Sequence, residues 1–579
     1  MAEPLGEHVR RGERLLHRHL LIQGHAEQQG QWAALQQPVG LWIDGQHERH
    51  TRHLAWPADP GRHRRSGGRP AGAADAGRHE RQDEGVDEHD MLLSPAGVDA
   101  LRTALTRTGF TSHGIAERLG AQATAAVARN DYRAALRATE DGDPLGTLIR
   151  VFICDQTEPE AAVAAALAPL ALEEALAGGL VERYGDGLRA GVDLEPYGDD
   201  WWVLADVPAS ARPGHPLHAE HVLGIGGATQ TLIGATVRRR VGSALDLGTG
   251  SGVQALHLAT HADTVTATDL SERALRFAAT TAALNCQDWE LLRGDMVAPV
   301  AGRRFDLVVS NPPFVVGPGT TTHVYRDSGR VGDAIAAELA AAAPGLLTEG
   351  GTMQYLANWV HVAGEEWDER VAGWFAGTGL DAWVIQREVA DPMAYVDLWL
   401  TDVGQGADPQ RAAVWLDWFD AHKIEGVGFG IVSLRRGGHA DPVVRVEDLR
   451  QQVQPPLGDQ IGAWFDRQDF LRVRDTEALL AERYRATDGL QLRQEATMGE
   501  EGWAVDRQVL AMPHGLRWTE EIDPLVLALV GGADGRLPLR DQLALLAAAH
   551  DVEPAEMAEA AGPIVAHLVE RGFIEPVTA

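Results

Sequence analysis

The feature of this sequence that most constrains its fold is an alternation of strand-like and helical segments between residues 217 and 436. Seven strand-like runs in this range are predicted strands: SALDL, TVTAT, WELLRGD, FDLVVS, TMQYL, AWVIQREV and VGFGIVSL. Strands that alternate with helices predict an α/β fold with a doubly wound, largely parallel sheet of seven strands. The connection from 391 to 425 carries its own aromatic-rich helical stretch, so we expect an inserted cap there, with the last strand antiparallel beside the sixth.

Three further segments flank this sheet, because 579 residues exceed what one core of ordinary size organises. Residues 91–207 show helical spacing and then two strands joined by a turn at 196–199, which predicts a helical, winged-helix-like domain. Residues 437–579 show helical faces, and we expect a second helical or winged-helix-like module. Residues 1–90 hold 10 of the 23 histidines and no sustained period, which predicts a disordered or non-native extension with the native start near Met91.

Composition excludes several classes of function. The formal net charge is −32, from 51 basic and 83 acidic side chains, and such a surface disfavours general binding to a phosphate backbone. No apolar run is long enough to span a bilayer, and the first residues lack the apolar core of a signal peptide. The two cysteines cannot form a disulfide framework or a four-cysteine metal site, so we expect a cytoplasmic protein without a metal.

A glycine-rich turn follows the first predicted strand, in the segment ALDLGTGSG at 244–252. Gly248, Gly250 and Gly252 permit a tight turn and a close approach of backbone to ligand, and amides at the following helix start can donate to a carboxylate or phosphate. The spacing G-x-G-x-G differs from the G-x-G-x-x-G fingerprint of dinucleotide binding. The turn therefore favours another adenosine-containing ligand over NAD, although a nicotinamide-dependent oxidoreductase remains a rival interpretation.

Two carboxylates follow the next two predicted strands. Asp269 ends the second strand, where it can accept both hydroxyls of a ribose, and Asp295 closes the third, where it can accept an adenine amino proton. Ligands of open α/β sheets bind at the carboxyl edge, where both residues and the glycine turn fall.

The fourth predicted strand ends in the most specific segment, Asn311-Pro312-Pro313-Phe314. The prolines fix the backbone and remove donors, so the Asn311 side-chain oxygen and the Pro312 carbonyl can both accept hydrogen bonds from one NH2 group. The ring of Phe314 can stack on a planar amide or base. The segment predicts a site for a flat nitrogen group.

Together, DLGTGSG, Asp269, Asp295 and NPPF resemble the class I S-adenosylmethionine (SAM)-dependent methyltransferases that methylate planar amide or amino nitrogens. The resemblance covers roughly residues 217–436 and implies SAM as cofactor. It further implies that Asp246 and the three glycines bind the cofactor, the glycines against its methionine part, with Asp269 on the ribose and Asp295 on the adenine. Asn311 and Pro312 would hold the acceptor NH2.

Within that branch, NPPFVVGP is similar to the loop of HemK-like glutamine methyltransferases that modify peptide release factors, but Phe314 replaces their usual tyrosine. Ribosomal RNA guanine-N2 methyltransferases of the small-domain type commonly carry phenylalanine there, so RNA remains an alternative acceptor. The acidic composition favours a protein glutamine. A non-catalytic nucleic-acid-binding regulator is a rival suggested by the winged-helix-like modules, and the sequence predicts no oligomeric state.

Overall fold

The computed structural model describes residues 91–579 apart from 199–200, 210, 213–216, 320–328, 403–408, 501 and 578–579, so the interpretations of residues 1–90 lie outside the described part. The chain divides into two compact units. One holds the sheet and the N-terminal module up to Asp448, and the other holds residues 449–579 together with 234–238. Within the described residues, none of the helices combines the length and apolar character needed to cross a membrane.

An eight-stranded sheet organises the first unit, in the order β12-β10-β11-β9-β8-β5-β6-β7. Its strands are β5 (Val241–Leu247), β6 (Ala262–Asp269), β7 (Glu290–Arg293), β8 (Phe305–Ser310), β9 (Leu347–Val362), β10 (Asp381–Ala390), β11 (Ile424–Arg435) and β12 (Val444–Asp448). The five strands from β7 to β9 are parallel, whereas β11 runs antiparallel between β9 and β10. The α/β fold class and the antiparallel entry of the last expected strand are confirmed.

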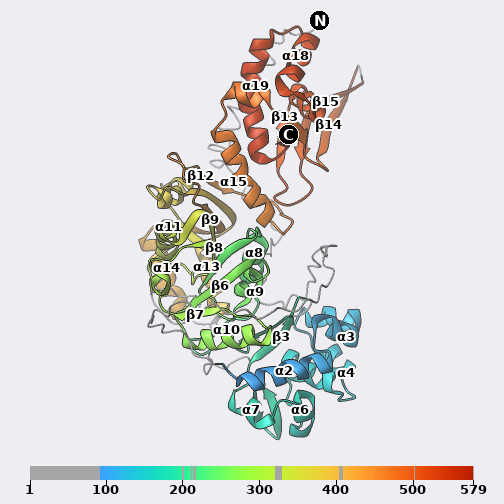
Figure 1. The fold of residues 1–579 in the computed structure, drawn as a ribbon, viewed down its shortest axis with the longest axis vertical. Helices are drawn as coiled ribbons and strands as arrows, with labels where there is room; N and C mark the ends of the chain where they lie inside the picture. Colours follow the sequence, from blue (N-terminus) through green and yellow to red (C-terminus); the bar gives the residue numbers. More distant parts are fainter. Residues whose placement is uncertain are drawn as a thin grey trace, which may run out of the picture. The chain divides into compact units, whose positions relative to one another are not determined.

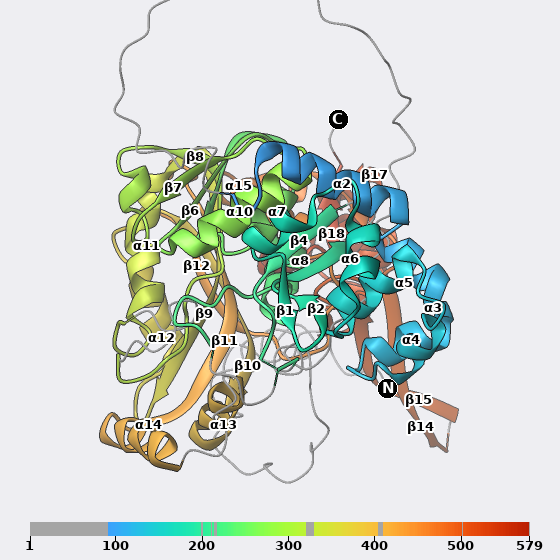
Figure 2. The same cartoon turned by 90° about the horizontal axis from the view of Figure 1, so that it is seen from below.

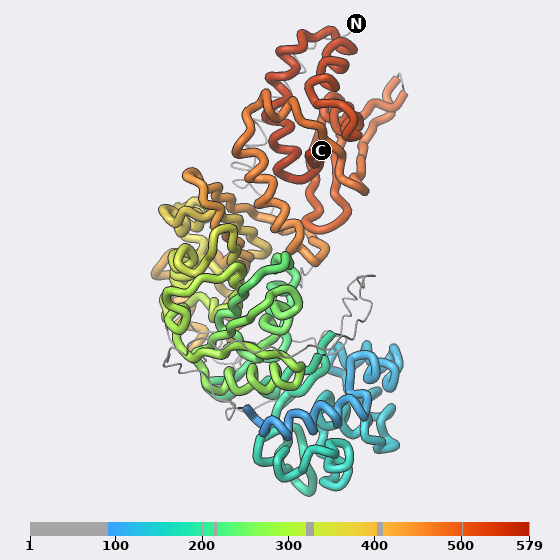
Figure 3. The backbone as a smooth tube through the Cα atoms, viewed as in Figure 1, coloured from blue at the N-terminus to red at the C-terminus, as the bar shows by residue number. Residues whose placement is uncertain are grey.

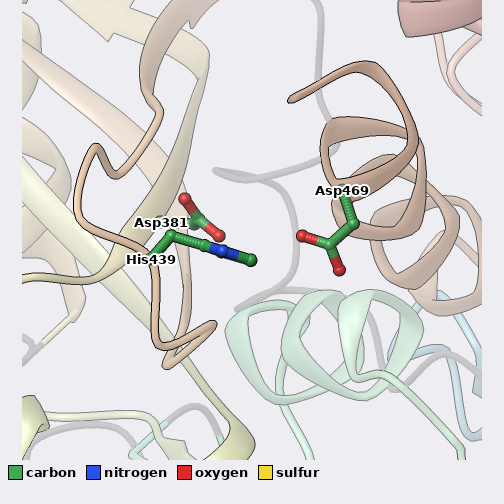
Figure 4. Close-up of side chains that lie close together, drawn as sticks. All are labelled: Asp381, His439 and Asp469. Carbon is green, nitrogen blue, oxygen red and sulfur yellow. The ribbon is translucent and has the colours of Figure 1, made fainter. Parts of the chain in front are cut away.

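The sheet has one more strand than the seven expected, because β12 pairs in parallel with β10 and extends the sheet past residue 436. The carboxylate of Asp381 anchors the connection to this strand: it accepts a hydrogen bond from the Val443 amide (2.8 Å) and pairs with Arg435 (3.2 Å). The ring of His439 lies beside the same carboxylate, within 4.8 Å (Figure 4). The short strand lacks a strong apolar pattern, so local sequence did not reveal it.

Helices cover both faces of the sheet. Alternation along β5 directs Leu245 and Leu247 into a core with α11 (Ala334–Leu346), α12 (Trp367–Ala372) and the 3₁₀ turn Gly373–Phe375. Asp246 lies on the opposite face and accepts a hydrogen bond from an amide of α9 (Val253–Leu258). Helix α10 (Glu272–Leu284) packs on β6 and β7 (Figure 1). The expected insertion forms α13 (Pro392–Asp402) and α14 (Pro409–Ala421), which lie together against β11 (Figure 2).

The N-terminal module is helical and ends in two hairpins. Its elements are α2 (Pro95–Thr108), α3 (Ser112–Val127), α4 (Arg133–Ala138), α5 (Pro144–Leu148), a π-helical turn (Ile149–Ile153), α6 (Glu160–Leu167), α7 (Leu172–Ala177), β1 (Val181–Tyr184), β2 (Gly187–Ala190), β3 (Asp193–Tyr197) and β4 (Trp201–Ala205). Ser94 caps α2 through its side chain, and Gly109 ends that helix in the left-handed region (φ 72°). β1 pairs with β2 and β3 with β4, and helix α8 (Gly227–Ala235) precedes the sheet.

The N-terminal module shares its hydrophobic core with helix α10 of the sheet domain. Ala274, Phe277 and Leu284 of α10 are buried in the same cluster as the module's apolar residues. The Asn285 side chain, directly after α10, donates to the Trp202 carbonyl (2.7 Å) and accepts from the Trp202 amide (2.9 Å). The module is thus built onto the sheet domain through a common core.

We expect Asn285→Ala to loosen strand β4, because it leaves the Trp202 amide and carbonyl without this partner. The loss of two hydrogen bonds costs about 2 kcal/mol, so the β4 amides should exchange hydrogen about 30-fold faster. Hydrogen exchange followed by mass spectrometry measures this local free energy. Gln287→Ala, which removes a single 3.2 Å bond to the Asn285 carbonyl, is the control, and equal exchange rates in the two variants would contradict the prediction.

The second unit contains a helical core and two small sheets, traced in Figure 3. Its elements are α15 (Gly458–Arg472), α16 (Thr476–Ala481), β13 (Arg483–Ala486), β14 (Gln491–Gly499), β15 (Gly502–Ala511), β16 (Thr519–Ile522), α17 (Pro524–Gly532), β17 (Asp534–Pro538), α18 (Leu539–His550), α19 (Pro554–Arg571) and β18 (Ile574–Pro576). The sheet order is β17-β13-β18 in one sheet and β14-β15-β16 in the other.

Candidate active site

Strand register brings the predicted site residues to one edge of the sheet. Thr268, Leu247 and Ser310 lie side by side on the adjacent strands β6, β5 and β8. Asp269, Gly248 and Asn311 each follow one of these residues directly. Because neighbouring strands lie about 4.8 Å apart, the three chain positions are neighbours at the carboxyl edge. The Ser310 hydroxyl donates to the Leu247 carbonyl (2.7 Å) and fixes the register there.

The glycine turn follows β5 and is fastened to strand β6. The amides of Gly248 and Thr249 both donate to the Thr268 carbonyl, at 3.0 and 2.9 Å. All three predicted glycines have positive φ: 77° at Gly248, 55° at Gly250 and 87° at Gly252. At Gly252 a Cβ would also lie 2.8 Å from the Trp289 ring, so only glycine fits there.

Asp246 lies beneath the glycine turn, almost fully buried. Its Oδ2 accepts from the Thr249 hydroxyl (2.7 Å) and the Ala255 amide (3.1 Å). Its Oδ1 is buried and finds no hydrogen-bond partner among the described residues. Burial, together with the nearby charge of Asp269, raises the pKa of Asp246 to about 7.

The raised pKa of Asp246 predicts a pH-dependent stability difference. Between the ordinary value of 3.8 and about 7 the folded chain holds a proton here that the unfolded chain releases, so the free energy of unfolding falls as pH rises toward 7 and levels off above it. We expect Asp246→Asn to gain about 2 to 3 kcal/mol relative to wild type between pH 5 and pH 8 in urea unfolding without ligand. Asp306→Asn on β8 is the control, since hydrogen bonds, chiefly from Thr348, lower the pKa of Asp306 out of this range. A difference between Asp246→Asn and wild type that stays constant with pH would contradict the prediction.

Asp269 connects the glycine turn to the start of α10. Its Oδ2 accepts from the Gly250 amide and its Oδ1 from the Ser271 amide, both at 2.9 Å. Burial raises the pKa of Asp269, and the charge of Glu220 adds to this effect. Glu220, which accepts from the Ser271 hydroxyl at 3.3 Å, was not expected at this edge, because it lies in an irregular segment without a motif.

Asp295 lies two residues past the end of β7 and is more than half exposed. Its Oδ2 pairs with the Arg330 guanidinium at 3.2 Å, and Arg330 also pairs with Glu338 at 3.1 Å. The structure thus places Asp295 at the same sheet edge, in contact with a cation that the sequence did not predict as its partner.

The Asn311-Pro312-Pro313-Phe314 segment leaves β8 beside the glycine turn. The Asn311 Oδ1 atom is buried and has no hydrogen-bond partner in the described part of the chain. Phe314 is buried, and its ring meets Trp399 of α13 edge to face, with 6.1 Å between centroids. A buried amide oxygen without a partner among the described residues is a site that an N–H donor would complete.

Helix α13 holds the segment that follows Phe314. The buried Tyr395 hydroxyl accepts from the Val316 amide (2.8 Å) and from the Asn358 side chain (3.0 Å). The Asn358 Oδ1 atom is buried without a hydrogen-bond partner in the described residues. Asn358 and Tyr395 were missed from the sequence, since no local pattern connects residues 316, 358 and 395.

Three family models match the chain. Residues 223–365 match the methyltransferase small domain, and this range contains every predicted site residue. Residues 107–191 match DUF7059 and residues 462–576 match DUF7782, both described as domains of unknown function.

Two curated relatives illustrate the similarity. A ribosomal RNA small subunit methyltransferase C of Alcanivorax borkumensis is 31% identical over 155 residues, which are 27% of this chain and 44% of the relative. A ribosomal protein uL3 glutamine methyltransferase of Xanthomonas campestris pv. campestris is 43% identical over 86 residues, 14% of this chain and 28% of the relative. The chain thus covers less than half the length of these relatives.

Among solved structures, a ribosomal protein L11 methylase from Lactobacillus delbrueckii subsp. bulgaricus matches 36% of this chain and 80% of its own, with 19% identity and a TM-score of 0.22. The family assignment depends on the family model and the curated relatives. Residues 223–365 belong to the methyltransferase small domain family of class I, SAM-dependent methyltransferases.

Proposed function

We propose that this chain methylates the side-chain amide nitrogen of a glutamine in a protein, with SAM as methyl donor. The observation that carries the proposal is the buried Oδ1 of Asn311, which has no hydrogen-bond partner among the described residues and lies at the carboxyl edge of β8, beside the glycine turn. A primary amide supplies the N–H donor that this oxygen lacks and a flat face for the Phe314 ring.

The residues at the edge fit SAM. The Oδ1 of Asp246, which has no partner among the described residues, can offer a carboxylate oxygen to the ammonium group of the methionine part, beneath the glycine turn. The Asp269 carboxylate can accept further hydrogen bonds from the ribose hydroxyls, because each oxygen has more than one lone pair. Asp295 would bind the adenine. When bound, SAM supplies an electrophilic methyl group on sulfur.

The chain's own contribution to transfer is orientation of a weak nucleophile. The lone pair of an amide nitrogen is delocalised, and N–H bonds accepted by Asn311 Oδ1 and the Pro312 carbonyl favour the more electron-rich nitrogen of the transition state. With SAM bound, the amide nitrogen would take the methyl group from sulfur, S-adenosylhomocysteine would leave, and the nitrogen would release one proton to solvent. Phe314 holds the amide plane, and the Tyr395 bond to the Val316 amide fixes the chain behind that ring.

Charge favours a protein acceptor over a nucleic acid. Residues 91–207 contain nine arginines, no lysine and 18 acidic residues. Several of these arginines are paired with carboxylates, among them Arg118 with Asp141 and Arg150 with Glu158. In the second unit the exposed side chains of α19 and its cap include Glu553, Glu556 and Glu559. Such surfaces repel phosphate and attract basic proteins.

A guanine amino group in ribosomal RNA is the second candidate acceptor. It is favoured by Phe314, which stands where glutamine methyltransferases usually carry tyrosine, and by the RNA methyltransferase among the relatives. The same two oxygens could accept the exocyclic N–H bonds of guanine, and the ring could stack on the base.

Purified chain incubated with methyl-labelled SAM and a ribosome-containing extract separates the two candidates. Label that protease releases and ribonuclease spares, located on glutamine by mass spectrometry, supports the proposal. Purified ribosomal protein uL3, the protein in the name of the Xanthomonas relative, is the first defined acceptor to test. Label that only ribonuclease releases would contradict the glutamine assignment and favour guanine.

A further inference from the structure

Hairpin β14–β15 of the second unit extends beyond the core that supports it. Every residue of β14 is exposed, and so is most of the facing part of β15. Isolated two-stranded hairpins are marginally stable in water, and the third strand, β16, pairs only with the far end of β15. Among the described residues of its own unit, none covers the distal half of the hairpin.

One face of this distal half is apolar. The register pairs Met498 with Trp503 and Ala496 with Val505, so these four side chains share a face that we call the apolar strip. Trp503 is 70% exposed, Met498 57% and Val505 49%. The strip lies on the same face as Leu510, which is buried in the core of the unit, so it continues a core-facing surface into solvent.

The opposite face of the hairpin carries charged side chains. It carries Arg507, which pairs with Glu495 at 3.5 Å and with Glu521 of β16 at 2.9 Å. Sheets with one face in water normally alternate polar and apolar positions, and here the described part of the chain provides no layer over the apolar face. An exposed apolar face of this kind marks a contact surface for another molecule.

Charge identifies the kind of molecule. The segment 449–579 contains 12 arginines, no lysine and 22 acidic residues, and exposed Glu500 stands at the tip of the hairpin. Two copies of this acidic unit repel each other, and the unit also repels the phosphate backbone of a nucleic acid. A basic protein is attracted to it. In addition, β14 is an edge strand of its sheet, with main-chain groups open to an extended segment of a protein.

We propose that the β14–β15 hairpin is a docking surface for a basic protein, which places apolar side chains on the strip next to its lysines and arginines. That this protein is the methyl acceptor rests on the proposed function. Docking on a surface separate from the reacting amide holds the acceptor on the enzyme and lowers KM without changing the chemical step.

The test uses the full chain, with fluorescently labelled uL3 as the probe. Replacing both Met498 and Trp503 by serine should weaken binding about tenfold or more, because aromatic anchors dominate such contacts. Glu500→Lys should also weaken it, and added salt should reduce affinity. Thr497→Ala and Ala504→Ser change the opposite face of the same strands and should leave affinity unchanged. Equal affinity for uL3 in the double variant and wild type overturns the proposal.

Other outcomes decide between occupants. If the double variant loses affinity for a ribosomal RNA fragment and keeps its affinity for uL3, the basic-protein assignment is wrong. It is also wrong if sedimentation shows that the wild-type chain is a dimer and the double variant is a monomer. Docking of the acceptor is supported if the double variant and wild type methylate a short glutamine peptide at equal rates while the KM of the variant for the whole protein rises. If the proposed function is wrong but the docking proposal is right, the chain will methylate no protein, yet its binding of uL3 will still depend on the hairpin.

Discussion

Asn311→Ala is expected to lower kcat for methyl transfer by about 10² to 10³-fold while the affinity for SAM stays close to wild type. The Asn311 Oδ1 atom has no hydrogen-bond partner in the described chain, so its removal leaves no protein group unpaired. What is lost is the acceptor for one N–H of the substrate amide, an interaction that strengthens as the nitrogen becomes electron-rich. Single-turnover methylation of the acceptor, with SAM binding by calorimetry, measures both quantities.

Two further variants sharpen this prediction. Asn311→Asp keeps an acceptor oxygen at the same position and should retain more activity than the alanine variant. Gln287→Ala removes a side-chain amide after α10, outside the predicted site, and should leave kcat unchanged. A near-normal kcat for Asn311→Ala on the true substrate would exclude the proposed role of this oxygen.

The parts of the site that follow strands could be predicted from sequence. Gly248 and Asn311 directly follow strands β5 and β8, and Asp269 is the last residue of β6; parallel register alone brings these positions together. The fold class follows from the same alternation. The proposed roles of these residues, and the winged-helix-like character of the flanking modules, remain predictions.

Other features could not be predicted because they depend on contacts between distant segments. Tyr395 reaches the loop after Phe314 from a helix about 80 residues further along the chain, and Glu220 reaches Ser271 from an irregular segment. Strand β12 is short and mostly polar, and its pairing depends on the Asp381 contacts at the sheet edge. The core shared by α10 and the N-terminal module was also hidden, because the sequence shows which residues are apolar and not which helix they meet.

Asp269→Ala is expected to weaken SAM binding by about 100-fold or more. The carboxylate holds the Gly250 amide of the glycine turn and the Ser271 amide at the start of α10, so its removal frees the turn. It also removes the proposed acceptor for the two ribose hydroxyls, and hydrogen bonds to a charged group contribute about 1.5 to 3 kcal/mol each. Asp269→Asn, which keeps one acceptor oxygen and loses the charge, should fall between alanine and wild type.

Asp263→Asn is the matched control for Asp269, because it changes a carboxylate near the other end of the same strand. Asp263 is exposed and pairs with the equally exposed Arg240 at 2.9 Å, a contact that contributes little. Calorimetric titration with SAM should therefore give the wild-type affinity for this variant and a large loss for Asp269→Ala. If Asp269→Ala bound SAM as tightly as Asp263→Asn, the proposed role of this carboxylate would be wrong, and the ribose would have to be bound by other residues at the sheet edge.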